Sequence, residues 1–355
     1  MPKINLKALS KQELESFIKE SGLPAFRAKQ LLHWIYEKHV RSIADITELS
    51  KDLREKLPEK AYISNLEVLE RNVSGDGTEK YLFGLEDGES IESVLISDEE
   101  RLTLCISSQA GCAMGCRFCL TGTMGLKRNL RPHEIVDQVI SVNRMLALPS
   151  LPRGGKEGVI TNIVFMGMGE PLANFDSVVE ALRRITGLMK ISPRRITLST
   201  SGIAPKIPEL ALEAPKVKLA ISLNATTDRV RDYIMPVNRT WPLKTLLDAC
   251  RKIPLPARGR ITFEYVLLKK VNDTKEDAKR LVNILKGIPS KVNLIPFNPY
   301  TGSDFQRPDE KSVLEFQDIL LKAHIIAIIR KSKGYDISAA CGQLKARHIV
   351  GRTVL

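Results

Sequence analysis

Residues 111–119 read Gly-Cys-Ala-Met-Gly-Cys-Arg-Phe-Cys, which places three cysteines in the spacing C-x3-C-x2-C. The glycines allow the backbone to curl, so that Cys112, Cys116 and Cys119 can turn their sulfurs toward one centre. Thiolates are soft ligands that select zinc or iron–sulfur clusters. The stretch therefore predicts a metal centre. A strand predicted just before it, over residues 102–106, places this centre at the start of an α/β fold.

The chain beyond this stretch alternates between short β-rich runs and helical stretches. The further predicted strands cover residues 162–166, 196–200, 217–223, 261–267 and 292–297. The helices predicted between them include residues 132–145, 176–189 and 275–285. This alternation predicts a parallel sheet with helical crossovers, either an open doubly wound sheet or a barrel. In both architectures the active site lies at the carboxyl ends of the strands.

The first 98 residues carry a different pattern. Residues 1–58 predict short helices, and the first of them begins with the capping box Ser10-Lys11-Gln12-Glu13. Residues 62–98 change to strand character, with a turn at Gly75-Asp76-Gly77. We therefore expect a small helical domain and a β-rich segment ahead of the α/β region.

The composition favours a globular protein with an anionic partner. Of the 355 residues, 43% are hydrophobic and 27% charged, and 54 Lys and Arg against 41 Asp and Glu give a net charge of +13. Such a surplus of cations suits a polyanion, for example nucleic acid. The start, Met1-Pro2-Lys3-Ile4-Asn5, lacks an apolar signal core, and the longest apolar stretches are far shorter than the roughly 18 residues of a membrane span. We therefore expect a cytoplasmic protein with reduced cysteines.

The cysteine spacing leaves two metal centres open. Structural zinc needs four closed ligands, and the fourth would have to come from a distant part of the chain. A [4Fe–4S] cluster held by three thiolates leaves one iron without a protein ligand. That iron can bind the amine and carboxylate of S-adenosylmethionine (SAM). Cys250 lies in an apolar helical stripe, Leu246-Leu247-Asp248-Ala249-Cys250, and is expected to fill the core.

Several further motifs resemble those of known enzymes. The cysteine spacing after a first strand, followed by a parallel α/β pattern, resembles the radical SAM superfamily. More narrowly, five stretches together resemble the RlmN/Cfr family of adenine methyltransferases that act on large-subunit ribosomal RNA. These are Cys105-Ile106-Ser107-Ser108-Gln109, Phe165-Met166-Gly167-Met168-Gly169-Glu170-Pro171-Leu172, Leu198-Ser199-Thr200-Ser201-Gly202, Asn293-Leu294-Ile295-Pro296-Phe297-Asn298-Pro299 and Ala339-Ala340-Cys341-Gly342-Gln343-Leu344. The likeness covers nearly the whole chain.

The resemblance implies a fold of the α/β class. We expect a partial (β/α)6-type radical SAM barrel with a small N-terminal helical domain and a β-rich extension. The implied division of the chain has four parts: residues 1–60, an RNA-binding accessory domain; 61–98, the β-rich extension that carries a general base; 99–345, the barrel with a C-terminal catalytic-cysteine loop; and 346–355, a basic tail.

The resemblance also implies the cofactors, a [4Fe–4S] cluster and two molecules of SAM per turnover. Cys112, Cys116 and Cys119 would hold the cluster. The positions implied for SAM binding are Gly169, Glu170, Ser199, Ser222, Leu223, Asn224 and Asn298. Asn224 departs from the family pattern, which usually has His after Ser-Leu.

The reacting groups implied by the resemblance suit an unreactive target carbon. Adenine C2 lies between two ring nitrogens and is electron-poor, so a direct polar methyl transfer to it should fail. Cys341 would take a methyl group from one SAM and become S-methylcysteine, and a second SAM would supply a radical. Cys105 would resolve the resulting RNA adduct and leave a Cys105–Cys341 disulfide. Glu92 would act as the general base that removes the C2 proton.

The implied function is methylation of adenosine C2 in 23S rRNA and in the anticodon-adjacent position of tRNA. Two alternatives stay open: Cfr-like methylation of adenine C8, and a zinc-stabilised RNA-binding module without chemistry. The Glu-Pro pair at residues 170–171 and the stretch 295–299 resemble the C2 group more closely. The expected partners are 23S rRNA, tRNA and an electron donor such as a flavodoxin or ferredoxin. We expect a monomer without a membrane partner.

Overall fold

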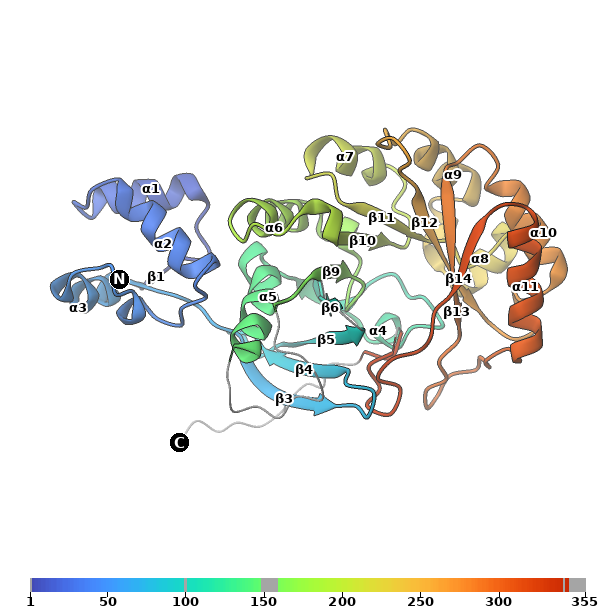
Figure 1. Cartoon of the computed structure of the whole chain (residues 1–355), viewed down its shortest axis with the longest axis horizontal. Coiled ribbons are helices and arrows are strands. Elements are labelled where there is room, and N and C mark those ends of the chain that lie inside the picture. Colours follow the sequence, from blue (N-terminus) through green and yellow to red (C-terminus); the bar gives the residue numbers. More distant parts are fainter. Residues whose placement is uncertain (1, 99–100, 148–158, 341, 345–355) are drawn as a thin grey trace.

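A computed structural model describes residues 2–98, 101–147, 159–340 and 342–344 of the chain. Its centre is a ten-stranded mixed sheet with the strand order β14-β13-β12-β11-β10-β9-β6-β5-β4-β3. Figure 1 shows helices along the outer face of this curved sheet and a separate helical lobe at the N-terminal end. Among the described residues, no helix has the length and apolar character that a bilayer crossing requires.

The strands fall into one large sheet and two small pairs. The strands of the large sheet are β3 (Glu67–Val73), β4 (Glu79–Gly84), β5 (Ser90–Asp98), β6 (Arg101–Cys105), β9 (Asn162–Phe165), β10 (Ile196–Thr200), β11 (Lys218–Ser222), β12 (Ile261–Leu267), β13 (Ser290–Pro296) and β14 (Ile326–Ile329). The small pairs are β1 (Ile4–Asn5) with β2 (Ala61–Tyr62), and β7 (Gln109–Cys112) with β8 (Gly125–Asn129).

The helices either form the N-terminal lobe or connect successive strands. The lobe holds α1 (Lys11–Glu20), α2 (Phe26–Tyr36) and α3 (Lys51–Lys60). The remaining helices are α4 (Leu120–Thr123), α5 (Pro132–Leu146), α6 (Phe175–Gly187), α7 (Lys206–Glu213), α8 (Asp228–Ile234), α9 (Leu243–Arg251), α10 (Lys275–Ile284) and α11 (Glu310–Lys322). The predicted capping box at the start of α1 is present, because Ser10 and Glu13 exchange hydrogen bonds between side chain and backbone.

The parallel part of the sheet confirms the predicted alternation of strand and helix. Strand β6 and strands β9 to β14 pair in parallel, and helices return the chain between them. Six of these strands are the predicted ones. Strand β14 was not predicted, because a short apolar run such as residues 325–329 has no periodicity that separates strand from helix.

The β-rich segment joins this sheet. Strands β3, β4 and β5 pair antiparallel and continue the sheet beyond β6, so ten strands form one surface. Ser93 on β5 donates from its Oγ to Gln138 Oε1 on α5, at 2.7 Å. The odd-numbered positions of β5 therefore face the helices. Successive side chains alternate across a strand, so Glu92 and Val94 face the opposite, concave side.

The same alternation organises the parallel strands. Leu104, Ile163, Leu198, Ile221 and Phe263 are fully buried against the core. Their neighbours along each strand point the other way, toward the concave face. The apolar positions therefore fix which polar side chains meet on the concave side of the sheet.

Candidate active site

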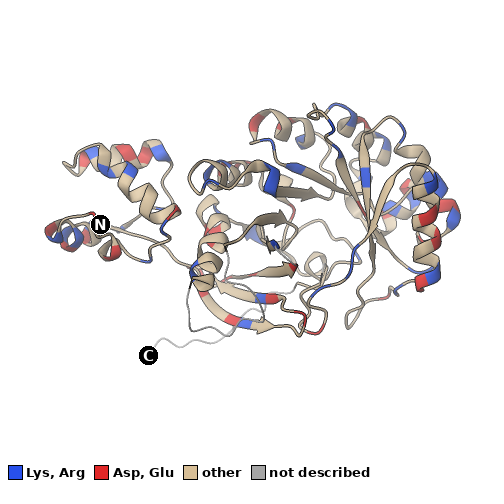
Figure 2. Ribbon diagram, viewed as in Figure 1, with Lys and Arg blue, Asp and Glu red and all other residues tan. Residues whose placement is uncertain are grey.

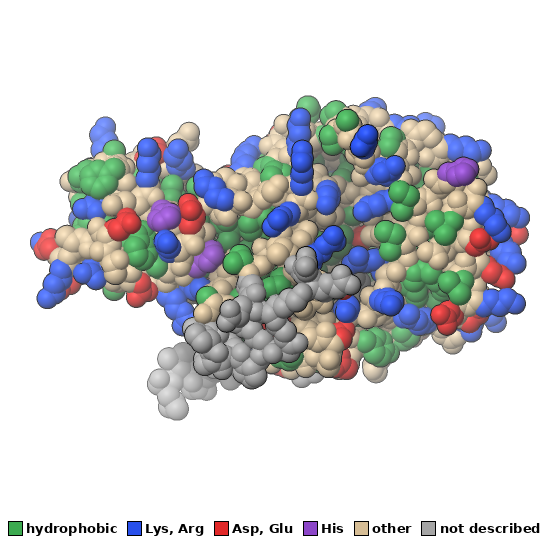
Figure 3. Space-filling model, viewed as in Figure 1, with side chains coloured by type: hydrophobic (Ala, Val, Ile, Leu, Met, Phe, Trp, Pro, Cys, Tyr) green, Lys and Arg blue, Asp and Glu red, His purple; other side chains and the backbone are tan. Residues whose placement is uncertain are grey.

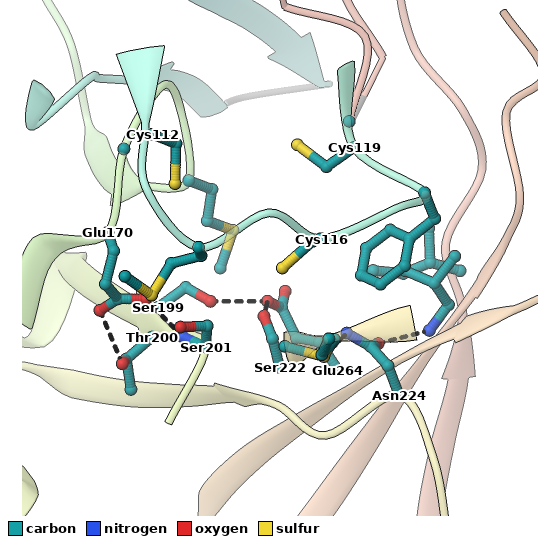
Figure 4. Close-up of a pocket in the computed structure, with 18 of the residues that line it drawn as sticks. Cys112, Cys116, Cys119, Glu170, Ser199, Thr200, Ser201, Ser222, Asn224 and Glu264 are labelled. Atoms are coloured by element: carbon teal, nitrogen blue, oxygen red, sulfur yellow. Dashed lines mark hydrogen bonds between the residues drawn. The ribbon is translucent and has the colours of Figure 1, made fainter. Parts of the chain in front are cut away.

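A cavity of about 160 Å³ opens at the carboxyl ends of the parallel strands, where the strand–helix alternation predicts an active site. Figure 4 shows the thiols of the cysteine loop and the polar residues at the strand ends directed toward a common space. Nine of the predicted site residues line this cavity: Cys112, Cys116, Cys119, Gly169, Glu170, Ser199, Ser222, Asn224 and Asn298.

The cysteine loop runs from the end of β7 to the start of α4. Its turn requires residues without a Cβ, since Gly111 and Gly115 have positive φ angles of 78° and 62°. At Gly111 a Cβ would lie 2.0 Å from the backbone oxygen of Gly125, so only glycine permits this approach of β7 to β8. The backbone N–H of Cys119 donates to the Cys116 carbonyl at 3.1 Å and closes the loop.

Burial controls the protonation of the three thiols. It raises the pKa of Cys112 to about 12, and it raises the pKa of Cys116 and of Cys119 above the ordinary thiol value as well. The thiols therefore carry their protons at neutral pH until a metal centre displaces them.

The donor set fits an iron–sulfur cluster. No group of three His, Cys, Asp or Glu side chains among the described residues is arranged to hold a single metal ion. The thiolates of a four-iron cluster bind different irons and stand farther apart than the ligands of one ion. Three soft sulfurs around one cavity, with polar side chains on its opposite wall, suit such a cluster and a ligand beside it.

Gly169 and Glu170 follow β9 and form one wall of the cavity. Gly169 has a φ of 99°, and a Cβ there would lie 2.5 Å from Gln109 Cβ, so packing against Gln109 explains the glycine. The Glu170 carboxylate accepts from Thr200 Oγ1 at 2.7 Å and from the backbone N–H of Ser201 at 2.6 Å. Burial outweighs these hydrogen bonds and raises the pKa of Glu170. The carboxylate thus joins the loop after β9 to the end of β10.

Ser199 and Ser222 meet at a residue that the sequence analysis did not single out, Glu264 on β12. Ser199 Oγ donates to Glu264 Oε2 at 2.7 Å, and Ser222 Oγ lies 3.5 Å from the same oxygen. Burial raises the pKa of Glu264. Glu264 lies inside the predicted strand 261–267 and belongs to no motif. Only its position on the concave face, next to Ser199 and Ser222, shows that it is part of the site.

Asn224 uses its side chain to hold the protein backbone. Its Oδ1 accepts from the Val266 N–H at 2.8 Å, and its Nδ2 lies 3.2 Å from Met235 Sδ. Its φ of 58° is one that Asn tolerates better than most residues. Leu223 is fully buried and is not among the residues that line the cavity.

Asn298 follows β13 and is tied to neighbouring loops. Its Oδ1 accepts from Ser332 Oγ at 2.5 Å and from Arg307 Nη1 at 3.3 Å. The side chain is therefore oriented by two loops that converge beside the cavity.

Glu92 and Cys105 lie next to the cavity rather than in its lining. Cys105 pairs in register with Val94 on β5 and with Val164 on β9, so its side chain shares the concave face with Glu92. Both residues are buried. The Glu92 carboxylate lies 3.4 Å from Lys80 Nζ, and the Glu92 carbonyl accepts from Ser107 Oγ at 2.6 Å.

Cys341 and the tail 346–355 lie outside the described residues. The segment on either side of Cys341 is described, and Gly342 lines the cavity. The Leu120 N–H donates to the Gly342 carbonyl at 2.8 Å, and Thr121 Oγ1 donates to the Leu344 carbonyl at 2.7 Å. Residues 342–344 therefore lie against the helix that follows the cysteine loop.

Two family models match the chain. One is described as "Ribosomal RNA large subunit methyltransferase N-terminal domain" and covers residues 4–63. The other, the "Radical SAM superfamily", covers residues 106–282. The first match covers the helical lobe. The second begins just after β6, covers strands β9 to β12 and ends within α10.

Relatives of known name cover nearly the full length. The chain is 54% identical to a "Dual-specificity RNA methyltransferase RlmN" of Pelobacter propionicus, over 97% of this chain and 96% of the relative. It is 53% identical to a protein of the same name from Geotalea uraniireducens, over 98% of both chains. A crystal structure of a radical SAM methyltransferase from Sphaerobacter thermophilus superposes with a TM-score of 0.91 at 41% identity, over 97% of this chain and 100% of that one. The chain therefore belongs to the RlmN family of radical SAM methyltransferases.

Proposed function

We propose that this protein methylates C2 of adenosine in 23S rRNA and in the anticodon-adjacent position of tRNA. The observation that carries the proposal is the meeting of two distant segments at one cavity: the cysteine loop and Gly342, the residue after Cys341. The proposal is supported by relatives named dual-specificity RNA methyltransferases, to which the chain is similar over nearly its whole length.

Cys112, Cys116 and Cys119 would hold the [4Fe–4S] cluster of the radical SAM family. When bound, the cluster supplies the electron that cleaves SAM and yields a carbon radical. Glu170, Ser199 and the neighbouring strand ends would bind SAM through their hydrogen-bonding groups, with Asn298 on the loop after β13. The same lining also holds the apolar side chains of Phe297 and Met235.

The protein's own side chains would then carry the methyl group to RNA. The Cys341 thiolate takes a methyl group from SAM and holds it as a thioether. After a hydrogen atom has been removed from that methyl group, the resulting carbon radical adds to adenine C2. The adduct must then give up one electron, for which the oxidised cluster held by Cys112, Cys116 and Cys119 would be the acceptor. Glu92 accepts the C2 proton. The Cys105 thiolate attacks the Cys341 sulfur, the sulfur–carbon bond breaks with its electron pair going to the carbon on C2, and that carbon takes up a proton to become the methyl group. The two cysteines are left as a disulfide that must be reduced before the next turnover.

The positions of Glu92 and Cys105 support these roles. Both side chains lie on the concave face of neighbouring strands, and Cys105 stands opposite Val94, two residues from Glu92. Glu92 is 5% and Cys105 is 7% exposed, so both side chains are shielded from bulk water on that face. A base and a resolving thiol on one sheet face can act in turn on one adduct.

The charge of the molecule supports an RNA substrate. Figure 3 shows Lys and Arg side chains spread over one face, in its middle as well as at its two ends. Figure 2 shows that cations are present on the N-terminal lobe as well as on the barrel. Some of the cations are neutralised within the protein, as Arg128 is by Asp87 and Glu134. The net charge of +13 remains available to phosphates.

The proposal extends to the protein's surroundings. The chain would act as a monomer in the cytoplasm, where rRNA and tRNA are found. A small one-electron donor of the flavodoxin or ferredoxin type would reduce the cluster. Cfr-like methylation at C8 and zinc-stabilised RNA binding without chemistry give different products, and nucleoside and metal analyses separate them from C2 methylation.

The resolving role of Cys105 gives the sharpest test. We expect Cys105→Ala to accumulate a covalent protein–RNA adduct and to release no methylated RNA, because no thiol is left to attack the Cys341 sulfur. Cys250→Ala is the matched control, since Cys250 is a buried cysteine in the apolar face of α9. It should turn over without an adduct. Denaturing gels and nucleoside mass spectrometry report both outcomes, and normal product release by Cys105→Ala would contradict the assignment.

A further inference from the structure

Lys80 lies between the proposed base and the segment that leads to Cys341. It is on β4, in register with Val94 of β5, while Glu92 is in register with Leu82. Lys80 and Glu92 are therefore diagonal neighbours on the concave face. The Lys80 side chain is 14% exposed and that of Glu92 is 6% exposed, so solvent screens this pair only weakly.

The Lys80 ammonium contacts both groups. Its Nζ is 3.4 Å from Glu92 Oε1 and 3.5 Å from the Ser338 carbonyl oxygen. Ser338 precedes Cys341 by three residues. One cation thus touches the carboxylate proposed to accept the C2 proton and the chain just ahead of the proposed methyl carrier.

The β3–β4 hairpin holds the same segment at other points. The backbone N–H of Gly334 donates to Asp76 Oδ2 at 3.0 Å, and Asp336 accepts from Ser74 Oγ at 2.5 Å. Gly334 approaches the hairpin so closely that a Cβ would lie 2.9 Å from Thr78 Cγ2. The hairpin that carries Lys80 is therefore fastened to residues 334–338.

We propose that Lys80 is a positioning residue that holds the Glu92 carboxylate ionised and in register with the segment bearing Cys341. The inference rests on the proposed role of Glu92 as the base. An ammonium beside a carboxylate favours its charged form, which is the form that can accept a proton. The contact with Ser338 lets the same ammonium hold one further point of residues 334–338, beside those held by the hairpin.

The test compares Lys80→Met and Lys80→Arg in the reconstituted full-length enzyme. Single-turnover methylation of RNA is measured from pH 4 to pH 9, a range that includes the ordinary carboxyl pKa, and the isotope effect of adenosine deuterated at C2 shows where proton transfer limits the rate. We expect Lys80→Met to move the acid limb of the profile up by about one pH unit, which is about a tenfold loss on the acid side, with nearly full rate at high pH. Lys80→Arg should restore the wild-type limb.

A second measurement follows the segment itself, independent of turnover. Amide hydrogen exchange at residues 334–340 should become faster in Lys80→Met and stay at the wild-type rate in Lys80→Arg. Lys244→Met is the matched control, because Lys244 forms an exposed ion pair with Asp248 on α9. It should change neither the profile nor the exchange.

The outcomes separate this inference from the proposed function. If Glu92→Gln still forms methylated RNA, Glu92 is not the base and the proposed mechanism fails. Suppose that Glu92→Gln abolishes product. The role of Lys80 is then wrong, and that of Glu92 stands, if Lys80→Met loses rate equally at every pH. The same holds if Lys80→Met keeps the wild-type acid limb of the pH–rate profile and the wild-type hydrogen exchange. A displaced limb rescued by Arg supports Lys80.

Discussion

Arg231 on α8 is a fully buried cation behind the polar ends of β10 and β11. Its Nη2 donates to the Ser201 carbonyl at 2.6 Å and to the Ser222 carbonyl at 3.2 Å, and its Nε donates to the Leu223 carbonyl at 3.0 Å. Burial lowers the pKa of Arg231 to about 10, which still leaves the guanidinium charged at neutral pH. The planar guanidinium therefore holds together the segment after β10, which contains Ser201, and the end of β11, which contains Ser222.

We expect Arg231→Lys to destabilise the protein and to weaken SAM binding. A single ammonium can replace Nη2 at the Ser201 and Ser222 carbonyls but leaves the buried Leu223 carbonyl, to which Nε donates, without its donor, at a cost of about 2 kcal/mol. Arg251→Lys on α9 is the matched control, because that arginine pairs with Asp248 at the surface. Urea unfolding and equilibrium dialysis with SAM measure the two effects, and unchanged values in Arg231→Lys would contradict this role.

At the scale of single residues, the sequence predicts best where chemistry imposes a spacing. Cys112, Cys116 and Cys119 converge on one cavity, as their spacing predicts. Arg231 and Glu264 could not be found in this way. An arginine in a helix and a glutamate in a strand usually lie on the surface, and only tertiary burial shows that these two organise the site.

At the scale of elements, the N-terminal lobe is joined to the barrel through the residues that follow β1. Lys7 donates to Asp137 on α5 and, at 2.7 Å, to the Ser64 carbonyl. Arg184 on α6 donates to the Lys7 carbonyl at 2.6 Å. Burial lowers the pKa of Lys7 and raises that of Asp137, and each charge partly offsets the effect on the other.

We expect Lys7→Met to lower the free energy of unfolding by about 3–5 kcal/mol, because it leaves Asp137 buried without a counter-charge. The double variant Lys7→Met with Asp137→Leu should recover most of that loss, since an apolar pair replaces the ion pair. Lys11→Met is the control, as Lys11 pairs with Glu15 in solvent. Urea unfolding of the wild type, of both single variants Lys7→Met and Asp137→Leu, and of the double variant gives the coupling, and a loss below about 1 kcal/mol in Lys7→Met would contradict it.

The sequence predicts the helices and strands better than the contacts that join them. The strand–helix alternation after residue 100 is present as predicted, because it rests on hydrophobic periodicity. The pairing of β5 with β6, and the fastening of the β3–β4 hairpin to residues 334–338, join parts of the chain by contacts that have no local signal.

At the scale of the whole molecule, one continuous sheet brings the proposed chemistry together. Strands β3 to β5 carry Glu92, β6 carries Cys105, and strands β9 to β13 carry the polar ends that face the cavity (Figure 1). The concave face carries the proposed base Glu92 and the proposed resolving thiol Cys105, and the three cysteines of the loop line the cavity together with Gly342. Lys and Arg side chains are spread over one face of the molecule that this sheet supports (Figure 3).

The central claim is that the cysteine loop drives methylation of adenosine at C2. The most direct test incubates unmodified 23S rRNA and tRNA, without oxygen, with reconstituted wild-type protein and with a variant in which Cys112, Cys116 and Cys119 are all Ala. Digested RNA is then compared with 2-methyladenosine and 8-methyladenosine standards by mass spectrometry. We predict 2-methyladenosine with the wild type and none with the triple variant. Equal product from both proteins, or no 2-methyladenosine from the wild type, would contradict the claim.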